Sequence, residues 1–538
     1  MSKYDYIIVG GGSAGCAVAG RLSRDADCRV LLIEAGGSDR TTFCRKPGMI
    51  AIVHTVPQIK KKFDWGYYTN PRKETLKRKI PYIRGKVLGG SSAINGMIFV
   101  RGHRANFDSW AEDDGCEGWS YEEILPYYKR MESFEDGASA YRGGDGPVHV
   151  TRHHEVSPVT EAFIDAVSDV CRVDITDDYN AYEQEGVGKV QMSARDGVRY
   201  SSSEAYVHPA MGRPNFDVVL GAQVTRIVIE KGRATGVEYI QGDRTVVAHA
   251  AEEIILSAGV IGSAQILMLS GVGPAAHLKE HGIDVVSDLP VGQNLHDHLF
   301  FPLVFLAPRG GHQGTPLHFL GGMLQEYLLG KTWFGKTLFE SVAFVKTDAS
   351  QPIPDLQLHS MPWAYPAPNQ DKPGRPDVDM RPALTVQPTL IYPRSRGEVL
   401  LTSGDPLAAP LIDPHYLEEE ADVDFLLRSI ELTREIMASS SIAGELSGEL
   451  EPGPKFFQRD AMRKELPNRV CTVYHPVGTC RMGVDERAVV DPQLRVLGVE
   501  GLRVADAAIM PTIIGGNTNA PCMMIGEKCA DLILEAQR

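Results

Sequence analysis

The chain has 538 residues, of which 43% are hydrophobic and 23% charged, and it carries a net charge of −14. This length is too great for one compact core and predicts roughly two to four domains. The acidic balance disfavours a nucleic-acid partner and a general affinity for anionic membranes, because both are polyanionic. The nine cysteines include no C-x-x-C pair, so we expect neither a disulfide framework nor a bound metal.

A nucleotide-binding turn is predicted near the start of the chain. Residues 6–9 (YIIV) are a short apolar run typical of a buried parallel strand. Gly10, Gly12 and Gly15 follow with the G-x-G-x-x-G spacing. The first glycine permits a tight turn, the second lets the backbone approach a pyrophosphate, and the third lets the helix pack closely on the strand.

The residues after this turn complete a β-α-β unit. A helix continues through residues 17–22, and its N-terminal N–H groups would face the phosphates. Residues 30–33 (VLLI) predict the second strand, and Glu34 closes it where a carboxylate can accept hydrogen bonds from a ribose diol. The unit therefore predicts dinucleotide binding, without distinguishing FAD from NAD.

The next two segments are less regular. Residues 36–83 predict a long excursion, in which the lysines at 60–62 form a solvated edge. Residues 85–96 (GKVLGGSSAING) form a second turn rich in glycine and serine, whose small side chains would let backbone N–H groups approach a ligand. Taken alone, this turn is equally consistent with a plain helix cap.

The middle of the chain predicts several strands and then a second domain. Residues 216–261 alternate and turn repeatedly, as expected of strands with a hairpin, and they lead into a helix. Residues 300–395 are the bulk of the predicted second domain. We expect more of their aromatic side chains to lie in the hydrophobic core than to line a substrate pocket. Residues 421–440 have the spacing of an amphipathic helix.

No segment predicts export or membrane insertion. No apolar stretch reaches the roughly 18 residues that a membrane-spanning helix needs. No basic and then apolar leader precedes the first strand. We therefore expect a cytoplasmic protein without a transmembrane segment, and peripheral contact with a membrane stays open.

Two polar groups near the C-terminus stand out. His475 precedes a proline, and Asn517 and Asn519 lie in an Asn-Thr-Asn run before a last predicted helix, with a strand predicted at 502–507. By itself, a histidine before proline is usually a polar loop residue, and the Asn-Thr-Asn run is a helix cap. Their presence in one chain with the N-terminal motif strengthens a functional interpretation of both.

Four separated matches make the sequence similar to the glucose–methanol–choline (GMC) family of flavin-dependent alcohol oxidoreductases, and within it to the choline dehydrogenase-like and long-chain alcohol dehydrogenase branch. They are the N-terminal unit with Glu34, the turn at 85–95, residues 259–273 and the block 475–519. The resemblance implies an α/β fold (α+β overall), with a Rossmann-like FAD-binding domain of discontinuous segments and a substrate domain whose antiparallel sheet is backed by helices. It places the FAD-binding domain at 1–155, 200–300 and 465–538, and the substrate-binding domain at 156–199 and 301–464.

The resemblance also implies roles for single residues. The catalytic residues would be His475, where the family has its histidine beside the flavin N5, and Asn517, which aligns with the family's second catalytic residue in preference to Asn519. Glu340 matches a position inside the substrate cavity, where relatives that oxidise choline place a carboxylate near the cationic headgroup. Relatives that oxidise alcohols without a positive charge can carry this carboxylate too, so it leaves the substrate open. Substrate contacts are implied for Glu340, Val473 and Tyr474. Contacts with FAD are implied for Gly10, Gly12, Ser13, Ala14, Gly15, Glu34, Ala35, Gly89, Ser91, Asn95, Gly96, Met97, Val224, Ala258, Gly259, Asp506, Ala507, Asn517 and Thr518.

The sequence departs from the family pattern at two places. Ile94 occupies the position at which some members attach FAD covalently through a histidine, so we expect noncovalent FAD. Val260 and Ala264 stand where the family signature usually has a small residue and a proline, which weakens that one match and leaves the other three intact.

These residues predict FAD-dependent oxidation of an alcohol to an aldehyde or ketone, by loss of the hydroxyl proton and transfer of a hydride to flavin N5. His475 would be the base or a hydrogen-bond stabiliser of the alkoxide, and Asn517 would fix the hydroxyl. We expect a dehydrogenase of primary alcohols that reduces a quinone or another carrier. The alternatives are an oxidase that reduces O2 to hydrogen peroxide and a lyase of the hydroxynitrile type with a structural FAD. An NAD-dependent dehydrogenase fits only the N-terminal motif.

Overall fold

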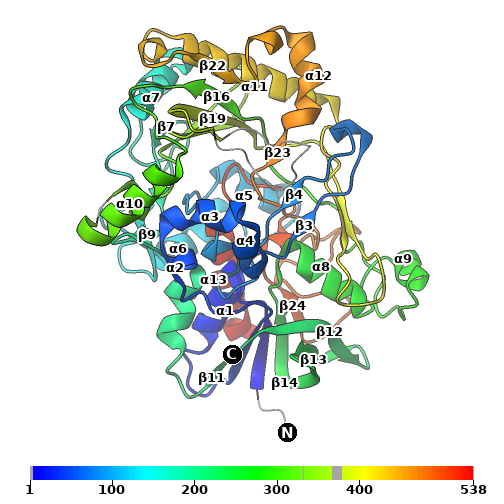
Figure 1. The fold of residues 1–538 in the computed structure, drawn as a ribbon. Coiled ribbons are helices and arrows are strands. Elements are labelled where there is room, and N and C mark those ends of the chain that lie inside the picture. The colour runs from blue at the N-terminus through cyan, green and yellow to red at the C-terminus, as the bar shows by residue number, and fades with distance from the viewer. Residues whose placement is uncertain (1–3, 331, 366–378, 537–538) are drawn as a thin grey trace.

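The computed structural model describes residues 4–330, 332–365 and 379–536. In Figure 1 a mostly parallel sheet with its helices occupies the lower half, and a large antiparallel sheet occupies the upper half. Segments from the two ends of the chain, blue and red, meet in the lower half. The structure therefore confirms the predicted mixed fold, in which one sheet is assembled from discontinuous segments.

The lower sheet has seven strands, five of which run parallel in the order β11-β2-β1-β14-β24. These are β11 (Phe216–Leu220), β2 (Val30–Glu34), β1 (Tyr4–Val9), β14 (Arg244–Leu256) and β24 (Leu502–Val504). In the centre of the sheet, Ile7 lies between Leu31 and Ile254. All three side chains are buried, as expected for parallel strands covered on both faces.

Strand β14 takes part in two kinds of pairing. Its first half pairs antiparallel with β13 (Arg233–Gln241), which in turn pairs with β12 (Ala222–Glu230). Its second half runs parallel to β1 and β24. The strands and the hairpin predicted for residues 216–261 are thus confirmed.

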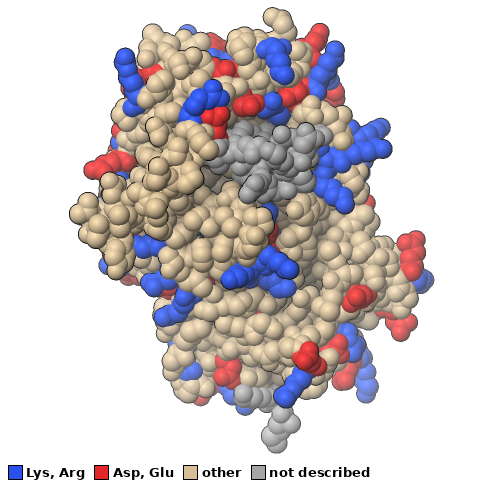
Figure 2. All heavy atoms as spheres, viewed as in Figure 1, with Lys and Arg blue, Asp and Glu red and all other residues tan. Residues whose placement is uncertain are grey.

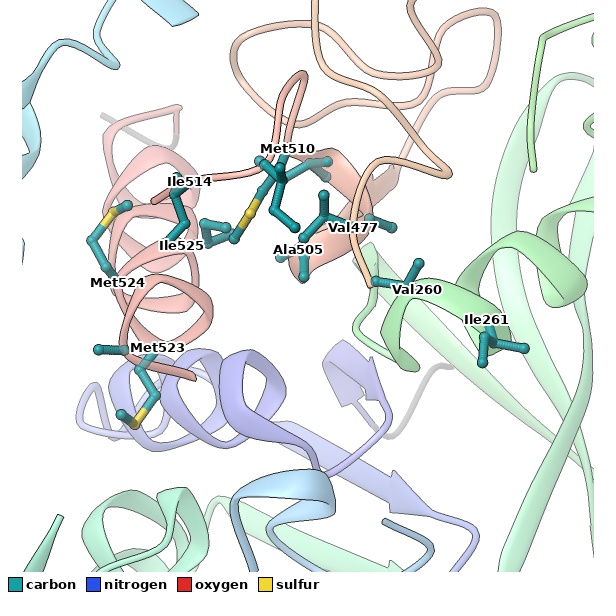
Figure 3. Packing of buried hydrophobic residues seen from close by; sticks show 14 of the residues in the cluster. Val260, Ile261, Val477, Ala505, Met510, Ile514, Met523, Met524 and Ile525 are labelled. Atoms are coloured by element: carbon teal, nitrogen blue, oxygen red, sulfur yellow. The ribbon is translucent and has the colours of Figure 1, made fainter. Parts of the chain in front are cut away.

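Three helices cover the lower sheet and bring both chain ends together. They are α1 (Ser13–Leu22), α8 (Gly259–Leu269) and α13 (Asn519–Ala536). Figure 3 shows Met523, Met524 and Ile525 projecting from α13, and Val260 and Ile261 on α8, within one buried apolar cluster. The last helix of the chain packs directly on the first.

The upper sheet is antiparallel throughout, with the order β22-β16-β19-β18-β17-β7 and with β15 paired to both β19 and β23. Its strands are β7 (Gly186–Lys189), β15 (Leu299–Phe300), β16 (Leu303–Leu306), β17 (Ser341–Val345), β18 (Leu356–Met361), β19 (Ala383–Leu390), β22 (Gly448–Glu451) and β23 (Cys471–Thr472). Helices α7 (Pro158–Cys171) and α11 (Glu420–Ala438) pack against it, and α12 (Arg459–Arg469) packs on α11. Helix α11 confirms the amphipathic helix predicted at 421–440, whereas the proposed domain boundaries stay predictions.

The predicted excursion at 36–83 contains short regular elements. It folds into a two-stranded hairpin and into helices that are too short to be recognised by periodicity.

The remaining α-helices and strands of the described chain are α2 (Thr42–Arg45), α3 (Ile50–Thr55), α4 (Pro57–Phe63), α5 (Arg104–Glu112), α6 (Tyr121–Met131), α9 (Ala275–Glu280), α10 (Pro316–Leu329), β3 (Tyr67–Tyr68), β4 (Pro81–Tyr82), β5 (Glu132–Phe134), β6 (Val148–Arg152), β8 (Gln191–Met192), β9 (Ala194–Arg195), β10 (Val198–Arg199), β20 (Glu398–Leu400) and β21 (Leu411–Asp413).

A buried ionic cluster, which we call the Glu132 cluster, lies at the start of β5. The carboxylate of Glu132 accepts hydrogen bonds from Arg101 Nη2 at 2.5 Å, from Arg142 Nε at 2.8 Å and from the N–H of Gly143 at 2.9 Å. All three charged side chains are buried. Arg142 Nη1 also donates to the carboxylate of Asp178 at 2.7 Å, so two guanidinium groups face two carboxylates and the cluster fixes the local fold.

Candidate active site

A cavity of about 830 Å³ lies between the two sheets. Its lining includes Val9 and Ile33 from the parallel sheet, and Phe300 and Met361 from the antiparallel sheet. Cavities of roughly 300–1,000 Å³ are typical of small-molecule sites. Most of the predicted site residues line this cavity, so the structure brings them together.

The N-terminal turn forms one end of the cavity. Gly10 has a φ of +99°, and a Cβ there would lie 2.5 Å from the carbonyl oxygen of Ser257. A Cβ on Gly15 would lie 2.0 Å from the carbonyl oxygen of Gly10, so this glycine lets α1 approach the strand and does not line the cavity. Helix α1 begins after Gly12 without a side-chain cap, and Gly12 and Ser13 line the cavity. The helix terminus therefore suits the pyrophosphate of a dinucleotide.

Glu34 ends β2 at this edge of the sheet. Its buried carboxylate accepts hydrogen bonds from the N–H groups of Gly11 at 2.8 Å and Gly36 at 2.7 Å. Burial raises the pKa of this carboxyl to about 7, and the two N–H groups partly oppose the shift. Ala35 and, from β12, Val224 line the cavity beside it, as expected for the adenosine end.

The turn rich in glycine and serine lies alongside. Ser91, Asn95, Gly96 and Met97 line the cavity, whereas Gly89 only ties the two turns together, its N–H donating to the carbonyl oxygen of Gly11 at 2.7 Å. Asn95 Oδ1 accepts hydrogen bonds from the N–H of Met97 and from Nη1 of Arg199 at 2.7 Å.

Arg199, in β10, is a residue that the sequence did not single out. Its guanidinium is buried and also donates to the carbonyl oxygens of Cys44 and Ser92. Burial lowers the pKa of Arg199 to about 10. Since Arg199 does not line the cavity, its role is to hold the turn in place.

Asp506 joins the C-terminal segment to the cofactor end. Its carboxylate accepts hydrogen bonds from the N–H of Gly259 at 2.8 Å, from Ser263 Oγ at 2.6 Å and from the N–H of Ala508 at 2.7 Å. These bonds bend the chain after Val504, which is why the strand predicted at 502–507 ends early. Ala258 and Ala507 line the cavity beside it.

His475 and Asn517 are neighbours at the other end of the cavity. Asn517 Nδ2 lies 3.2 Å from Nε2 of His475, and both residues line the cavity together with Val473, Tyr474 and Thr518. Asn519 instead begins α13 and accepts a hydrogen bond from Ser13 Oγ. This geometry supports the choice of Asn517 over Asn519 as the partner of His475.

The backbone around His475 is held by a buried carboxylate. Asp297 accepts hydrogen bonds from the N–H of His475 at 2.8 Å, from Thr472 Oγ1 at 2.5 Å and from Tyr416 Oη at 2.5 Å. Tyr474, just before His475, has a φ of +65°, a conformation that is sparsely populated outside glycine and concentrated at functional sites.

Three further polar residues surround this pair and were not predicted. His298 Nδ1 lies 3.1 Å from Nδ1 of His475, and Gln357 Nε2 donates to Asn517 Oδ1 at 3.1 Å. His359 lies two residues after Gln357 in β18 and lines the cavity. The sequence held a signal for two of these residues, Gln357 and His359. They are polar, lie two positions apart in a buried strand and therefore face the same side of the sheet, which indicates a site on that side.

The histidines of this cluster are held neutral. Burial, reinforced by His298 and His359, keeps the pKa of His475 well below its usual value. Burial also lowers the pKa of His298 to about 3 and that of His359 to about 4. A neutral imidazole at His475 keeps a nitrogen lone pair near neutral pH that can accept a hydrogen bond or a proton from a substrate hydroxyl.

Glu340 lies outside the cavity lining, in contrast to the expectation for it. Its carboxylate accepts hydrogen bonds from the N–H and Oγ of Ser157 and from Thr160 Oγ1, at the N-terminus of α7. A carboxylate is stabilised there by the unpaired N–H groups of the helix. The structure thus gives this side chain a helix-capping role.

Ile94 lies in the cavity lining opposite the pair, as expected for the turn that contains it. His54, in α3, also lines the cavity, and its Nε2 lies 2.9 Å from the carbonyl oxygen of Ile94. Two of the aromatic residues assigned to the core, Trp363 and Tyr365, line the cavity as well.

The fold and this cavity define a flavoprotein of the alcohol-oxidising type. The chain belongs to the GMC oxidoreductase family, whose N-terminal region matches residues 4–300 and whose C-terminal region matches residues 393–526. It is an FAD-dependent oxidoreductase that acts on CH–OH donors. The glycine turns, Glu34 and the uncapped start of α1 fit FAD.

Curated relatives match almost the whole chain. The oxygen-dependent choline dehydrogenases of Sinorhizobium medicae and Photobacterium profundum are 41% and 40% identical to it, with 99% of this chain covered and 96% and 93% of theirs. Among solved structures, pyridoxine 4-oxidase from Mesorbium loti has a TM-score of 0.87 at 29% identity, with 99% of each chain covered. Formate oxidase from Aspergillus oryzae has a TM-score of 0.89 at 27% identity, with 100% of this chain and 99% of that chain covered.

Within the described residues, every helix is too short or too polar to cross a membrane.

Proposed function

We propose that this enzyme oxidises a neutral, largely apolar primary alcohol and passes the electrons to a carrier other than O2. The charge of the cavity lining carries the substrate class. Among the described lining residues, the carboxylates are Glu34 and Asp506, and both are bound by N–H groups at the cofactor end. The one lysine or arginine in that described lining is Arg84. At the His475 end of this lining a cationic alcohol would meet the positive charge of Arg84 and no carboxylate, because the nearby Asp64 and Asp297 lie behind the lining and already accept hydrogen bonds from the protein.

The rest of the lining supports an apolar chain on the substrate. The side chains around the mouth and the His475 end are mainly aliphatic or aromatic. They include Phe300, Phe319, Leu320, Met323, Leu338, Phe339, Met361 and Trp363. Each buried methylene of an alcohol would gain roughly 0.8 kcal/mol in such a pocket.

The roles of the polar residues follow from their geometry. FAD, when bound, supplies a hydride acceptor. His475 takes the hydroxyl proton at Nε2, while a hydrogen on its Nδ1 is shared with Nδ1 of His298. Asn517 Nδ2, at 3.2 Å from that Nε2, donates a hydrogen bond to the developing alkoxide, and Gln357 fixes the amide through Oδ1. Asp297 keeps the backbone of His475 in position.

We also propose that FAD is bound without a covalent link. Ile94 offers no nucleophile at the position that some family members use, and His54, the nearest imidazole to it, contacts the carbonyl oxygen of Ile94. Denaturation should therefore release the yellow colour into solution, and colour that stays with the precipitated chain would contradict this proposal.

Choline is the second candidate substrate. The choline dehydrogenases named above are about 40% identical over nearly the whole chain. Aromatic side chains such as Trp363 and Tyr365 could also contact a quaternary ammonium group through cation–π interactions.

A matched pair of alcohols separates the two candidates. Choline and 3,3-dimethyl-1-butanol have the same shape and differ in the charged nitrogen. We expect anaerobic bleaching of the flavin by the neutral alcohol and by straight-chain primary alcohols at concentrations at least about tenfold lower than by choline. A preference for choline of that size would overturn the substrate proposal.

The same experiment addresses the electron acceptor and the lyase alternative. After bleaching, slow recolouring in air and fast recolouring with a quinone would support a dehydrogenase. Fast recolouring in air would indicate an oxidase that forms hydrogen peroxide. A flavin that no alcohol bleaches would contradict the proposed function and favour a lyase with a structural FAD.

A further inference from the structure

Helix α10 (Pro316–Leu329) carries apolar side chains on the outside of the molecule. Leu317 is 81% exposed, Tyr327 87% and Leu329 79%. Leu320, Leu324 and Leu328 are exposed as well. Leu317, Leu320, Leu324, Tyr327 and Leu328 follow the three- and four-residue spacing of one helix face. Figure 2 shows a protruding surface without charged atoms over much of α10.

The inner side of α10 carries Phe319, which packs against Trp333 and Phe334, together with the one charged residue of the helix, so the apolar character of α10 is not confined to the side that faces the protein. Glu326, its one charged residue, is buried. The carboxylate lies 3.3 Å from Lys46 Nζ and accepts hydrogen bonds from the N–H and Oγ1 of Thr332. Turning the helix to bury its leucines would break this ion pair inside the protein, at a large desolvation penalty. The exposed apolar face is therefore fixed by the fold.

This helix also forms part of the rim of the active-site cavity. Pro316, Phe319, Leu320 and Met323 line the cavity from α10, and residues 50–52 and 54–56 line it from α3 and its end. The apolar surface outside the molecule is thus continuous with the apolar wall inside the mouth.

Basic residues lie on the same face as this rim. Helix α4 follows α3 directly, and its Lys61 and Lys62 are exposed, whereas Lys60 pairs with Asp64. Figure 2 shows lysine and arginine atoms gathered over α4, beside the uncharged surface of α10. In a chain with a net charge of −14, this combination of apolar and basic groups at the cavity mouth is a local exception.

We propose that this face docks on an anionic lipid bilayer, with α10 lying in the interface and the cavity mouth directed at the lipid. An apolar helix face beside lysines is the pattern that binds the boundary between headgroups and acyl chains. A second copy of the chain suits the same face less well, because a two-fold contact repeats the same basic residues on both sides. This docking proposal does not depend on the proposed substrate class. If both are correct, an apolar alcohol or a quinone could enter the cavity from the bilayer.

Flotation with vesicles tests this docking. The purified holoenzyme would be mixed with vesicles of phosphatidylcholine alone or with phosphatidylglycerol added. We expect flotation with the anionic vesicles, weakened by salt and at least about tenfold weaker in the variant Leu317→Glu/Leu328→Glu. The variant Lys61→Glu/Lys62→Glu should lose the preference for anionic over neutral vesicles.

A matched control carries the same added charge elsewhere. Ile175 and Val484 are also exposed, lie outside α10 and do not line the cavity. The variant Ile175→Glu/Val484→Glu should float like the wild type. All variants should keep their flavin and reduce it with a water-soluble alcohol within about twofold of the wild-type rate, so turnover and docking are scored separately.

Two outcomes would overturn the proposal. One is a wild-type holoenzyme that stays at the bottom of the gradient with both kinds of vesicle. The other is a dimer, seen by concentration-dependent gel filtration, that Leu317→Glu/Leu328→Glu dissociates, since α10 would then be covered by a second copy. Neither outcome depends on which alcohol the enzyme oxidises.

Discussion

The Glu132 cluster and the cluster around His475 are both buried and polar, but they are built in opposite ways. In the Glu132 cluster a carboxylate faces two guanidinium groups and one N–H, and none of these residues lines the cavity. Around His475 the histidine and amide side chains are neutral, and both ring nitrogens of His359 and Oε1 of Gln357 lack a hydrogen bond among the described atoms. The first arrangement pairs opposite charges away from the cavity and stabilises the fold, whereas the second keeps hydrogen-bonding capacity for a ligand.

The largest effect should follow from removing the imidazole at the centre of the second cluster. His475→Ala should keep its flavin but slow flavin reduction by substrate at least about a hundredfold, because the proton acceptor is lost. Stopped-flow absorbance under anaerobic conditions measures this rate. His154→Ala, at an exposed histidine outside the cavity, is the control. A variant that loses flavin and regains full activity on reconstitution would show that His475 only supports binding.

Breaking the Glu132 cluster should affect stability and leave the chemistry alone. Glu132→Ala would leave the buried guanidinium of Arg101 without its carboxylate and that of Arg142 with Asp178 alone, which costs about 3–5 kcal/mol of unfolding free energy. The midpoint of urea unfolding would report this loss. The rate of flavin reduction in the folded fraction should stay at the wild-type value.

A surface ion pair provides the comparison for that variant. Glu135 is exposed and pairs with His154. Glu135→Gln should change the unfolding free energy by no more than about 1 kcal/mol. If Glu132→Ala and Glu135→Gln both lower the unfolding free energy by no more than about 1 kcal/mol, the buried Glu132 cluster contributes less to stability than we expect.

A further expected effect concerns the pH dependence of stability. His359 has a folded-state pKa of about 4, below its ordinary value near 6.5, so the unfolded chain binds its proton first as pH falls. The contribution of His359 to the free energy of unfolding is therefore fully present above about pH 6.5. It is lost as the pH falls towards about 4, with a slope of at most about 1.4 kcal/mol per pH unit. Between about pH 5.5 and 4.5, His359→Asn should unfold with a shallower pH dependence than the wild type by that amount. Equal slopes would mean that His359 is already protonated in the fold.

Local sequence patterns predicted the structure correctly where the geometry of a segment depends only on its own residues. The G-x-G-x-x-G spacing predicted both the turn at Gly10 and the close approach of α1 at Gly15, because only a residue without a Cβ fits at either place. The β-branched runs predicted β1 and β2 for the same local reason. The pairing of Asn517 with His475 was predicted by resemblance, and the distance between them supports it.

The missed residues depend on contacts that no local pattern contains. His298 and Gln357 reach His475 and Asn517 from segments 177 and 160 residues away in the chain. Glu340 was expected to face the substrate, but the start of α7, more than a hundred residues earlier, binds its carboxylate. The outward direction of the leucines of α10 cannot be read from its sequence, since apolar residues lie on both sides of the helix and its one charged residue, Glu326, is buried.

The way the two chain ends meet has a consequence for how the protein is made. Ser13 and Asn519, 506 positions apart, are joined by a hydrogen bond beside the cofactor end of the cavity. While the ribosome is still synthesising the chain, the early strands and the first helix must wait without the helix that covers them, exposing apolar surface that favours aggregation. The cofactor end of the cavity is therefore complete only once α13 has packed on α1.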